Sequence, residues 1–221
     1  MNRQLCEMEL AAGIIHANSI GNQGSLLRTH PIPFNISTPG NCPSPWGHPD
    51  QSIIGGATSV MACGGITLPN DDPYSSSGEG PSAWEDITVY DAAYPHLQDP
   101  AYWDYTYGGF GGSGPGLLKP DVVAYTVNIL TTTIGTGYDN FGGTSAATPH
   151  LGGAMCLLRQ FQPEAEPRHI AAALELTATD LGVAGKDNDF GAGKVQVYDA
   201  ARRLQVLGRF DDNDPVIGTT L

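Results

Sequence analysis

The sequence has little positive charge and no long apolar run. Its 221 residues include 10 Lys and Arg against 23 Asp and Glu, which gives a formal net charge of −13. A surface of this sign repels phosphate backbones and anionic lipids, so we expect neither a nucleic-acid nor a membrane partner. No apolar stretch approaches a membrane span, and Arg3, Glu7 and Glu9 interrupt the region where a signal peptide would be apolar.

Cysteines are few and widely spaced. Cys6, Cys42, Cys63 and Cys156 form no CxxC pair, so their spacing indicates neither a zinc motif nor a redox motif. The composition is otherwise globular, with 40% apolar and 15% charged residues in a chain of single-domain length. The 29 glycines and 17 prolines favour long, shaped loops between helices and strands rather than a helical bundle.

Helical and β-favouring segments alternate along the chain, which predicts an α/β fold with a mostly parallel sheet and helices on both of its faces. We expect long loops over 25–52 and 69–119. The expected strands are Ile14 with Ile15, Val60 to Ala62 and Asp121 to Ala124, and the expected helices are Met1 to Ala12, Ser145 to Phe161, 164–178 and 197–207.

The most informative segment is the stretch from Gly142 to Gly153, in which Ser145 follows two glycines and a threonine and opens a helix. A serine at such a turn is accessible, and its main-chain N–H is one of the unpaired donors of a helix start. Both properties suit a nucleophile whose attack creates an oxyanion. The alternative interpretation is that Ser145 is only the N-cap of the helix.

This segment resembles the nucleophile motif of the subtilase family, Gly-Thr-Ser-x-Ala-x-Pro-His. A second segment, Gly21-Asn22-Gln23-Gly24, is similar to the family's Gly-Asn-x-Gly oxyanion motif and stands in the expected order. The resemblance implies a subtilisin-like fold in which Ser145 is the nucleophile. It also implies that the Asn22 amide and the Ser145 N–H hold the oxyanion, and that Ser19, Ile20 and Gly21 line one wall of the substrate pocket. The matched motif positions are Gly143, Thr144, Ser145, Ala147, Pro149 and His150.

The resemblance extends through Leu118 to Ala124 and through Asp189 to Val195, as far as about residue 205. We therefore expect 1–207 to be the C-terminal part of a catalytic domain and 208–221 to be a tail or linker. The family further implies a polypeptide substrate, secretion and possible calcium binding. The turn at 187–189 offers Asp and Asn oxygens, but an acidic turn is more often solvated surface, so we assign no metal there.

The catalytic Asp and His of the family precede the oxyanion asparagine, and this chain does not supply them. Only 21 residues precede Asn22; none is Asp, and their sole histidine, His16, is expected to pack against a neighbour. We therefore expect the missing N-terminal part as a partner and an inactive chain in its absence. Tyr125-Thr126 also replaces the family's usual Pro-Gly turn. Two alternatives remain: a non-catalytic pseudoprotease that binds or regulates, and an unrelated α/β domain.

Overall fold

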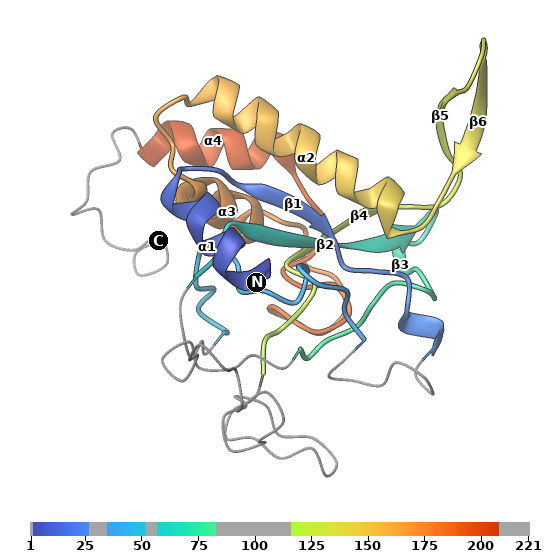
Figure 1. Ribbon diagram of the computed structural model, residues 1–221, viewed down its shortest axis with the longest axis horizontal. Helices are drawn as coiled ribbons and strands as arrows, with labels where there is room; N and C mark the ends of the chain where they lie inside the picture. The colour runs from blue at the N-terminus through green and yellow to red at the C-terminus, as the bar shows by residue number, and fades with distance from the viewer. Residues whose placement is uncertain (1, 27–34, 52–56, 83–115, 208–221) are drawn as a thin grey trace.

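The structure is a computed structural model that describes residues 2–26, 35–51, 57–82 and 116–207 (Figure 1). No helix within these ranges is both long and apolar enough to cross a membrane. The described elements, in chain order, are α1 (Asn2–Ala11), β1 (His16–Ser19), the 3-10 turn η1 (Gly24–Leu26), β2 (Val60–Thr67), β3 (Asp72–Pro73), β4 (Val122–Tyr125), β5 (Ile129–Thr133), β6 (Gly137–Phe141), α2 (Thr144–Phe161), α3 (Pro167–Leu176) and α4 (Val197–Leu207).

The central sheet is built around β2. Both β1 and β4 pair with β2 in parallel, with His16 opposite Val60 and Cys63 opposite Val122. The short β3 pairs with the end of β2 in the antiparallel direction. Every residue of β2 from Val60 to Ile66 is buried, as expected for a strand of a parallel sheet that is covered on both faces. The predicted α/β class with a mostly parallel sheet is confirmed.

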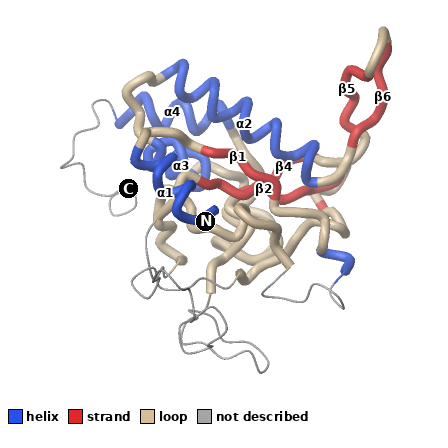
Figure 2. The backbone as a smooth tube through the Cα atoms, viewed as in Figure 1, coloured by secondary structure: helices blue, strands red, loops and turns tan. Residues whose placement is uncertain are grey.

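Helix α2 covers one face of this sheet, and α4 lies beside it (Figure 1). Ala147, Leu151 and Ala154 of α2 belong to the same buried core as Met61 and Cys63 of β2. The small alanine side chains let the helix axis approach the sheet closely. Loops cover much of the opposite face (Figure 2), and the chain between β4 and α2 reaches the first turn of α2 from the end of the sheet.

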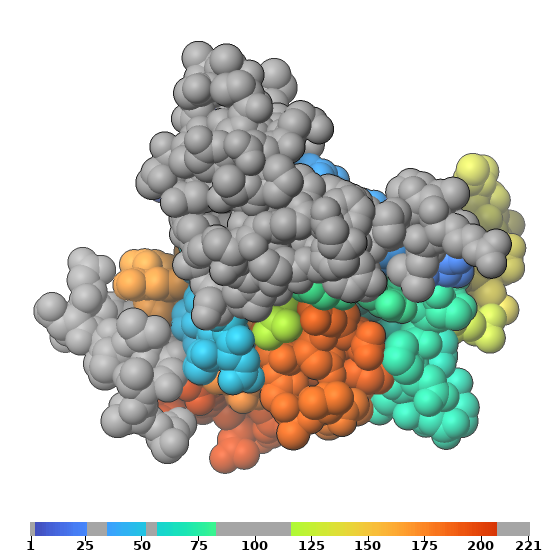
Figure 3. All heavy atoms as spheres, turned by 90° about the horizontal axis from the view of Figure 1, so that it is seen from below, coloured from blue at the N-terminus to red at the C-terminus, as the bar shows by residue number. Residues whose placement is uncertain are grey.

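A network of buried charges fixes the loops below the sheet. Lys119 Nζ lies 2.6 Å from Asp121 Oδ2, and Lys186 Nζ lies 3.2 Å from Asp121 Oδ1 and 2.8 Å from Glu175 Oε2. Burial would raise the pKa of Asp121, but the two ammonium groups hold it below its usual range. The main-chain N–H of Lys186 also donates a hydrogen bond to Asp50 Oδ2, so the segments around 45–51 and 180–190 lie side by side (Figure 3).

Lys186→Met is expected to lower the free energy of unfolding by about 3–5 kcal/mol. The substitution keeps the side-chain length but leaves the buried Asp121 and Glu175 carboxylates with Lys119 as their nearest cation. Equilibrium urea unfolding of the folded protein measures the change. The matched control is Arg168→Met, which removes an ion pair between Arg168 and Glu166. Both of these side chains are about half exposed, so this substitution should lower the free energy of unfolding by at most about 1 kcal/mol. Equal losses in both variants would contradict the prediction.

Several predicted boundaries differ from the structure. The strand predicted over Val60 to Ala62 continues to Thr67 as β2. The first strand begins at His16 rather than at Ile14, because the turn after α1 uses the intervening residues: Gly13 has φ 76°, and the Ile14 N–H donates to the Glu9 carbonyl at 2.9 Å. The helix predicted over 164–178 is shorter, Pro167–Leu176. Glu166 is its N-cap and forms a capping box with the third helical residue.

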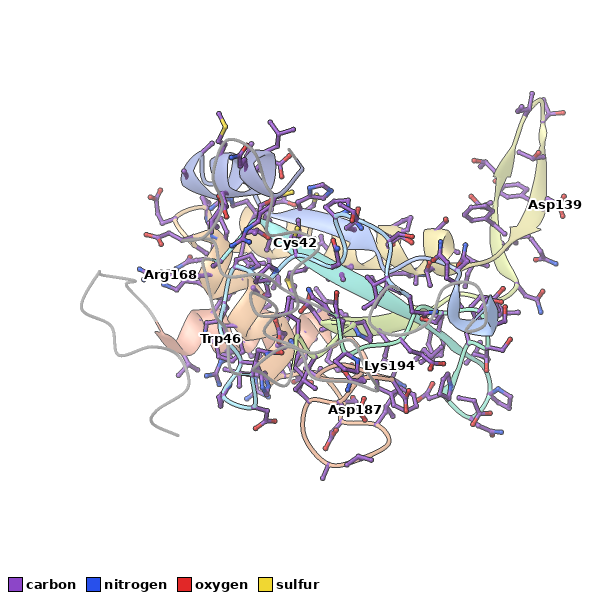
Figure 4. The ribbon with its side chains drawn as sticks, turned by 60° about the horizontal axis from the view of Figure 1, so that its bottom comes forward. Cys42, Trp46, Asp139, Arg168, Asp187 and Lys194 are labelled. Carbon is purple, nitrogen blue, oxygen red and sulfur yellow. The ribbon has the colours of Figure 1, made fainter. Side chains whose placement is uncertain are left out.

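The sequence did not indicate the hairpin of β5 and β6 that precedes α2. Its strands pair from Ile129 opposite Phe141 to Thr133 opposite Gly137, and the pair projects from the body of the molecule, where Asp139 lies apart from the other labelled residues (Figure 4). The strands, Ile-Leu-Thr-Thr-Thr and Gly-Tyr-Asp-Asn-Phe, lack an apolar alternation, which is why no strand was predicted. The tip residue Ile134 is fully exposed, so no other described residue covers the tip of this hairpin.

Candidate active site

Ser145 lies in the first turn of α2 with a free side chain. Gly143 is the N-cap and has φ 80°, Thr144 is the first helical residue, and Ser145 is the second. The interpretation of Ser145 as a mere N-cap is therefore wrong. Its side chain is exposed and has no hydrogen-bond partner within the described ranges. Its main-chain N–H belongs to the first-turn donors that a helix leaves unpaired.

Asn22 reaches this helix start from beyond the end of β1. Its Oδ1 accepts hydrogen bonds from the Thr144 N–H at 2.9 Å and from the Thr144 hydroxyl at 3.0 Å. A main-chain N–H can only donate, so the amide oxygen faces α2 and the Nδ2 group is left as a donor. Nδ2 has no partner among the described residues. A methyl group on Gly143 would lie 3.2 Å from Nδ2, so glycine keeps this space open.

Ser19 and Thr144 complete a directional chain of hydrogen bonds that orients Asn22. The two hydroxyl oxygens lie 2.7 Å apart, and the Gly21 N–H donates to Ser19 Oγ at 3.2 Å. Because Thr144 Oγ1 donates to Asn22, Ser19 Oγ donates to Thr144. Sequence reasoning had placed Ser19 only in a pocket wall and had given Thr144 no task. The signal that could have predicted the role of Thr144 was its position next to the serine in the nucleophile motif.

The other two residues predicted to line the pocket, Ile20 and Gly21, have no exposed side chain, so only their main chain could face a substrate. The Ile20 side chain is fully buried against Ile36 and Ala62. Gly21 has φ 103°, and its carbonyl accepts from the Gly78 N–H at 2.9 Å. A positive φ of this size favours glycine at position 21. The substrate-binding role of Ser19, Ile20 and Gly21 stays a prediction.

The segment before Gly143 is anchored where the sequence departs from the family pattern. The buried Thr126 hydroxyl donates to the Gly143 carbonyl and so holds the N-cap residue. The Tyr125 hydroxyl lies 3.3 Å from Lys194 Nζ, and hydrogen bonding to Asp71 raises the pKa of Lys194. The Tyr-Thr pair thus makes specific contacts that fix the approach to the nucleophile.

None of the histidines in the described residues is bonded to Ser145. His16 lies at the opposite end of β1 from Asn22, and His150 is five residues along α2, about 140° around the helix from Ser145. His30 and His96 lie outside the described residues. The partners are Glu9 Oε2 for His16 (3.1 Å), the Ala146 carbonyl for His150 (2.9 Å), the Trp46 ring for His48 (centroids 5.4 Å apart) and the Glu166 cap for His169.

The acidic turn at 187–189 is held together by its own first residue. Asp187 Oδ1 accepts from the N–H groups of Asp189 and Phe190, at 2.9 and 2.7 Å. Burial and the Asp187 charge raise the pKa of Asp189. Asp187 Oδ1 therefore accepts main-chain hydrogen bonds that stabilise the turn. Calcium binding here stays a prediction from the family resemblance.

A groove of about 590 Å³ runs between α2 and the free edge of the sheet. Ile14, Ile15 and Ala17 line one side, and Gly152 and Met155 of α2 line the other. Among the described strands, β1 pairs with β2 alone, so its outer edge carries unpaired main-chain groups. The groove and this edge form one continuous unpartnered surface.

Comparison with known proteins places almost the whole chain in one family. The pattern of the "Subtilase family" matches residues 1–193. The chain is 30% identical over 201 residues to the subtilisin-like protease SBT6.1 of Arabidopsis thaliana, a match that covers 88% of this chain and 15% of that protein.

Two bacterial proteins match shorter stretches. The extracellular serine protease of Serratia marcescens is 47% identical over 68 residues, which is 31% of this chain and 6% of that protein. Subtilisin BL of Lederbergia lenta is 40% identical over 93 residues, or 42% of this chain and 32% of that protein. The matched stretches thus span at most about a third of these relatives.

Proposed function

The chain belongs to the subtilase family, and on that premise we propose that it is the part of a serine endopeptidase that carries the nucleophile Ser145 and the oxyanion-binding Asn22. The substrate is a polypeptide, and the reaction is peptide-bond hydrolysis through an acyl-enzyme. The observation that carries the proposal is the pair of free groups at the start of α2: the exposed Ser145 hydroxyl and the Asn22 Nδ2, oriented through Thr144.

The geometry supports a specific division of tasks. Ser145 Oγ attacks the carbonyl carbon of the scissile bond, and its proton passes to a base and then to the leaving amine. The carbonyl oxygen becomes negative and accepts hydrogen bonds from Asn22 Nδ2 and from the Ser145 N–H, next to the positive end of the α2 dipole. Water then hydrolyses the ester on Ser145. Because Oδ1 of Asn22 is already bonded to Thr144, the donor is oriented before the charge develops.

The base and its orienting carboxylate belong, in this proposal, to an N-terminal part of the catalytic domain. The unpartnered surface at β1 supports such a partner, because a further strand could pair with its edge while apolar side chains fill the groove beside α2. The exposed apolar residues of the β5–β6 hairpin, Leu130 and Ile134 among them, offer a second contact surface. We further propose secretion, in line with the relative named an extracellular serine protease.

The 221 residues alone are expected to show no specific peptidase activity, because an unassisted serine hydroxyl is a weak nucleophile at neutral pH. The chain is to be assayed with and without its N-terminal complement, using peptide cleavage and labelling of Ser145 by a fluorophosphonate. We expect both signals only in the mixture. The chain alone should associate with itself or bind hydrophobic dyes through its open surface.

The matched control is the same mixture made with Ser145→Ala, which should lose both signals. Cleavage by a purified monomeric chain without complement would contradict the prediction and point to a base among its own histidines. A stable complex that neither reacts with the probe nor cleaves peptides would contradict the enzyme proposal and favour the non-catalytic binding module.

A further inference from the structure

Three metal-ligating side chains of different chemistry converge at the corner between α1 and β1. They are Cys6 and Glu9, three residues apart on one side of α1, and His16, the first residue of β1. One potential ligand atom from each lies within 4.8 Å of the other two. Cys6 is buried, whereas Glu9 and His16 keep about a third of their side-chain surface exposed. Solvent therefore reaches one side of the cluster.

We propose that Cys6, Glu9 and His16 bind a zinc ion, with water in the fourth position. Zinc takes sulfur, nitrogen and oxygen ligands at about 2.0–2.3 Å in a tetrahedron, which places neighbouring ligand atoms about 3.3–3.8 Å apart. His16 Nδ1 and Glu9 Oε2 are 3.1 Å apart, close to that spacing. A mixed thiolate, imidazole and carboxylate set suits zinc and is a poor match for calcium or magnesium, which require oxygen ligands.

Neighbouring groups hold the ligands in place. The Ser59 hydroxyl donates to Glu9 Oε2 at 2.6 Å, which fixes the carboxylate before an ion arrives. The Cys6 thiol lies beside Cys42 (labelled in Figure 4), whose S–H can donate to a thiolate.

A bound ion would tie α1 to the sheet. Two ligands come from the helix and one from β1, while Ser59 directly precedes β2. Zinc would therefore stabilise the folded chain by mass action at the corner that leads into the strand before Asn22.

The test is a titration of the full chain, kept reduced, with zinc and with cobalt. We expect one ion per chain, a thiolate-to-cobalt charge-transfer band in the near ultraviolet, and a rise in Tm with zinc but not with calcium. His16→Gln and Cys6→Ser should each weaken zinc binding by about tenfold or more and remove or alter the cobalt band. Circular dichroism checks that each variant retains its helices. His16→Gln, at a partly exposed position, keeps the test valid if the Cys6 variant misfolds.

The matched controls are Cys156→Ser and His150→Gln, which change the same residue types on the exposed surface of α2. Both should bind zinc like the parent chain. Three outcomes would overturn the proposal: no stoichiometric binding, equal binding by the parent and His16→Gln, or loss of binding in a control variant. A Cys6–Cys42 disulfide in protein isolated without reductant would also overturn it, because the sulfur ligand would be consumed.

Discussion

Replacing Ser145 by alanine in the complete enzyme is expected to lower turnover by about six orders of magnitude, the scale typical of removing the nucleophile from a subtilisin-type triad. The hydroxyl is the atom that becomes acylated, and no other side chain of the first turn of α2 can take its place. Thr144 Oγ1 is engaged with Ser19 and Asn22, and Thr148 Oγ1 donates to the Thr144 carbonyl at 2.8 Å. Single-turnover and steady-state assays of peptide cleavage measure the loss.

The fold of this variant should be intact, because Ser145 is exposed and its side chain bonds to no other described residue. We expect its free energy of unfolding to change by no more than about 0.5 kcal/mol. Ser75→Ala, at an exposed serine in the turn after β3, is the matched control and should retain full activity. Undiminished cleavage by Ser145→Ala would end the assignment of the nucleophile.

Asn22→Ala is expected to lower kcat by about 10² to 10³, or roughly 2.7–4 kcal/mol, with a much smaller change in KM. This magnitude is the one known for the same asparagine in subtilisin. The physical reason is that the Nδ2 donor meets its full partner, the oxyanion, only in the transition state. Measuring kcat and KM separately for one peptide substrate tests this prediction.

The control for Asn22 removes an amide of the same kind elsewhere. Asn70 is exposed in the turn between β2 and β3, and its Nδ2 contacts Asp72 only at 3.5 Å. Asn70→Ala should leave both kinetic constants unchanged. An effect of Asn22→Ala confined to KM would make Asn22 a binding or turn residue. A large loss of stability in this variant would instead show that its bonds to Thr144 hold the helix start.

The order of motifs in the sequence predicts the nucleophile and the oxyanion asparagine, and both roles stay predictions. The apolar run at Asp121 to Ala124 indicated a buried parallel strand, which the structure confirms as β4. The helix start at the nucleophile motif and the buried strand could be predicted because both depend on local chemistry: a glycine-flanked serine opens a helix, and an apolar strand must be covered on both faces. The β5–β6 hairpin was missed because its strands carry no apolar alternation, although the three-residue connection contains Gly135 with φ 97°. The start of β1 was predicted two residues too early, because the turn after α1 continues past Gly13 and includes Ile14.

What the chain order could not decide is which distant groups meet. The bonds from Thr144 to Asn22 span 122 residues and fix which end of the amide points outward, and only the packing of α2 against β1 creates them. The same holds for Cys6 and His16, whose spacing matches no metal motif although their ligand atoms converge. Residue type and local spacing determined the chemistry available to this protein. The direction of each donor depends on contacts between elements remote in sequence, so the tertiary structure alone decided it.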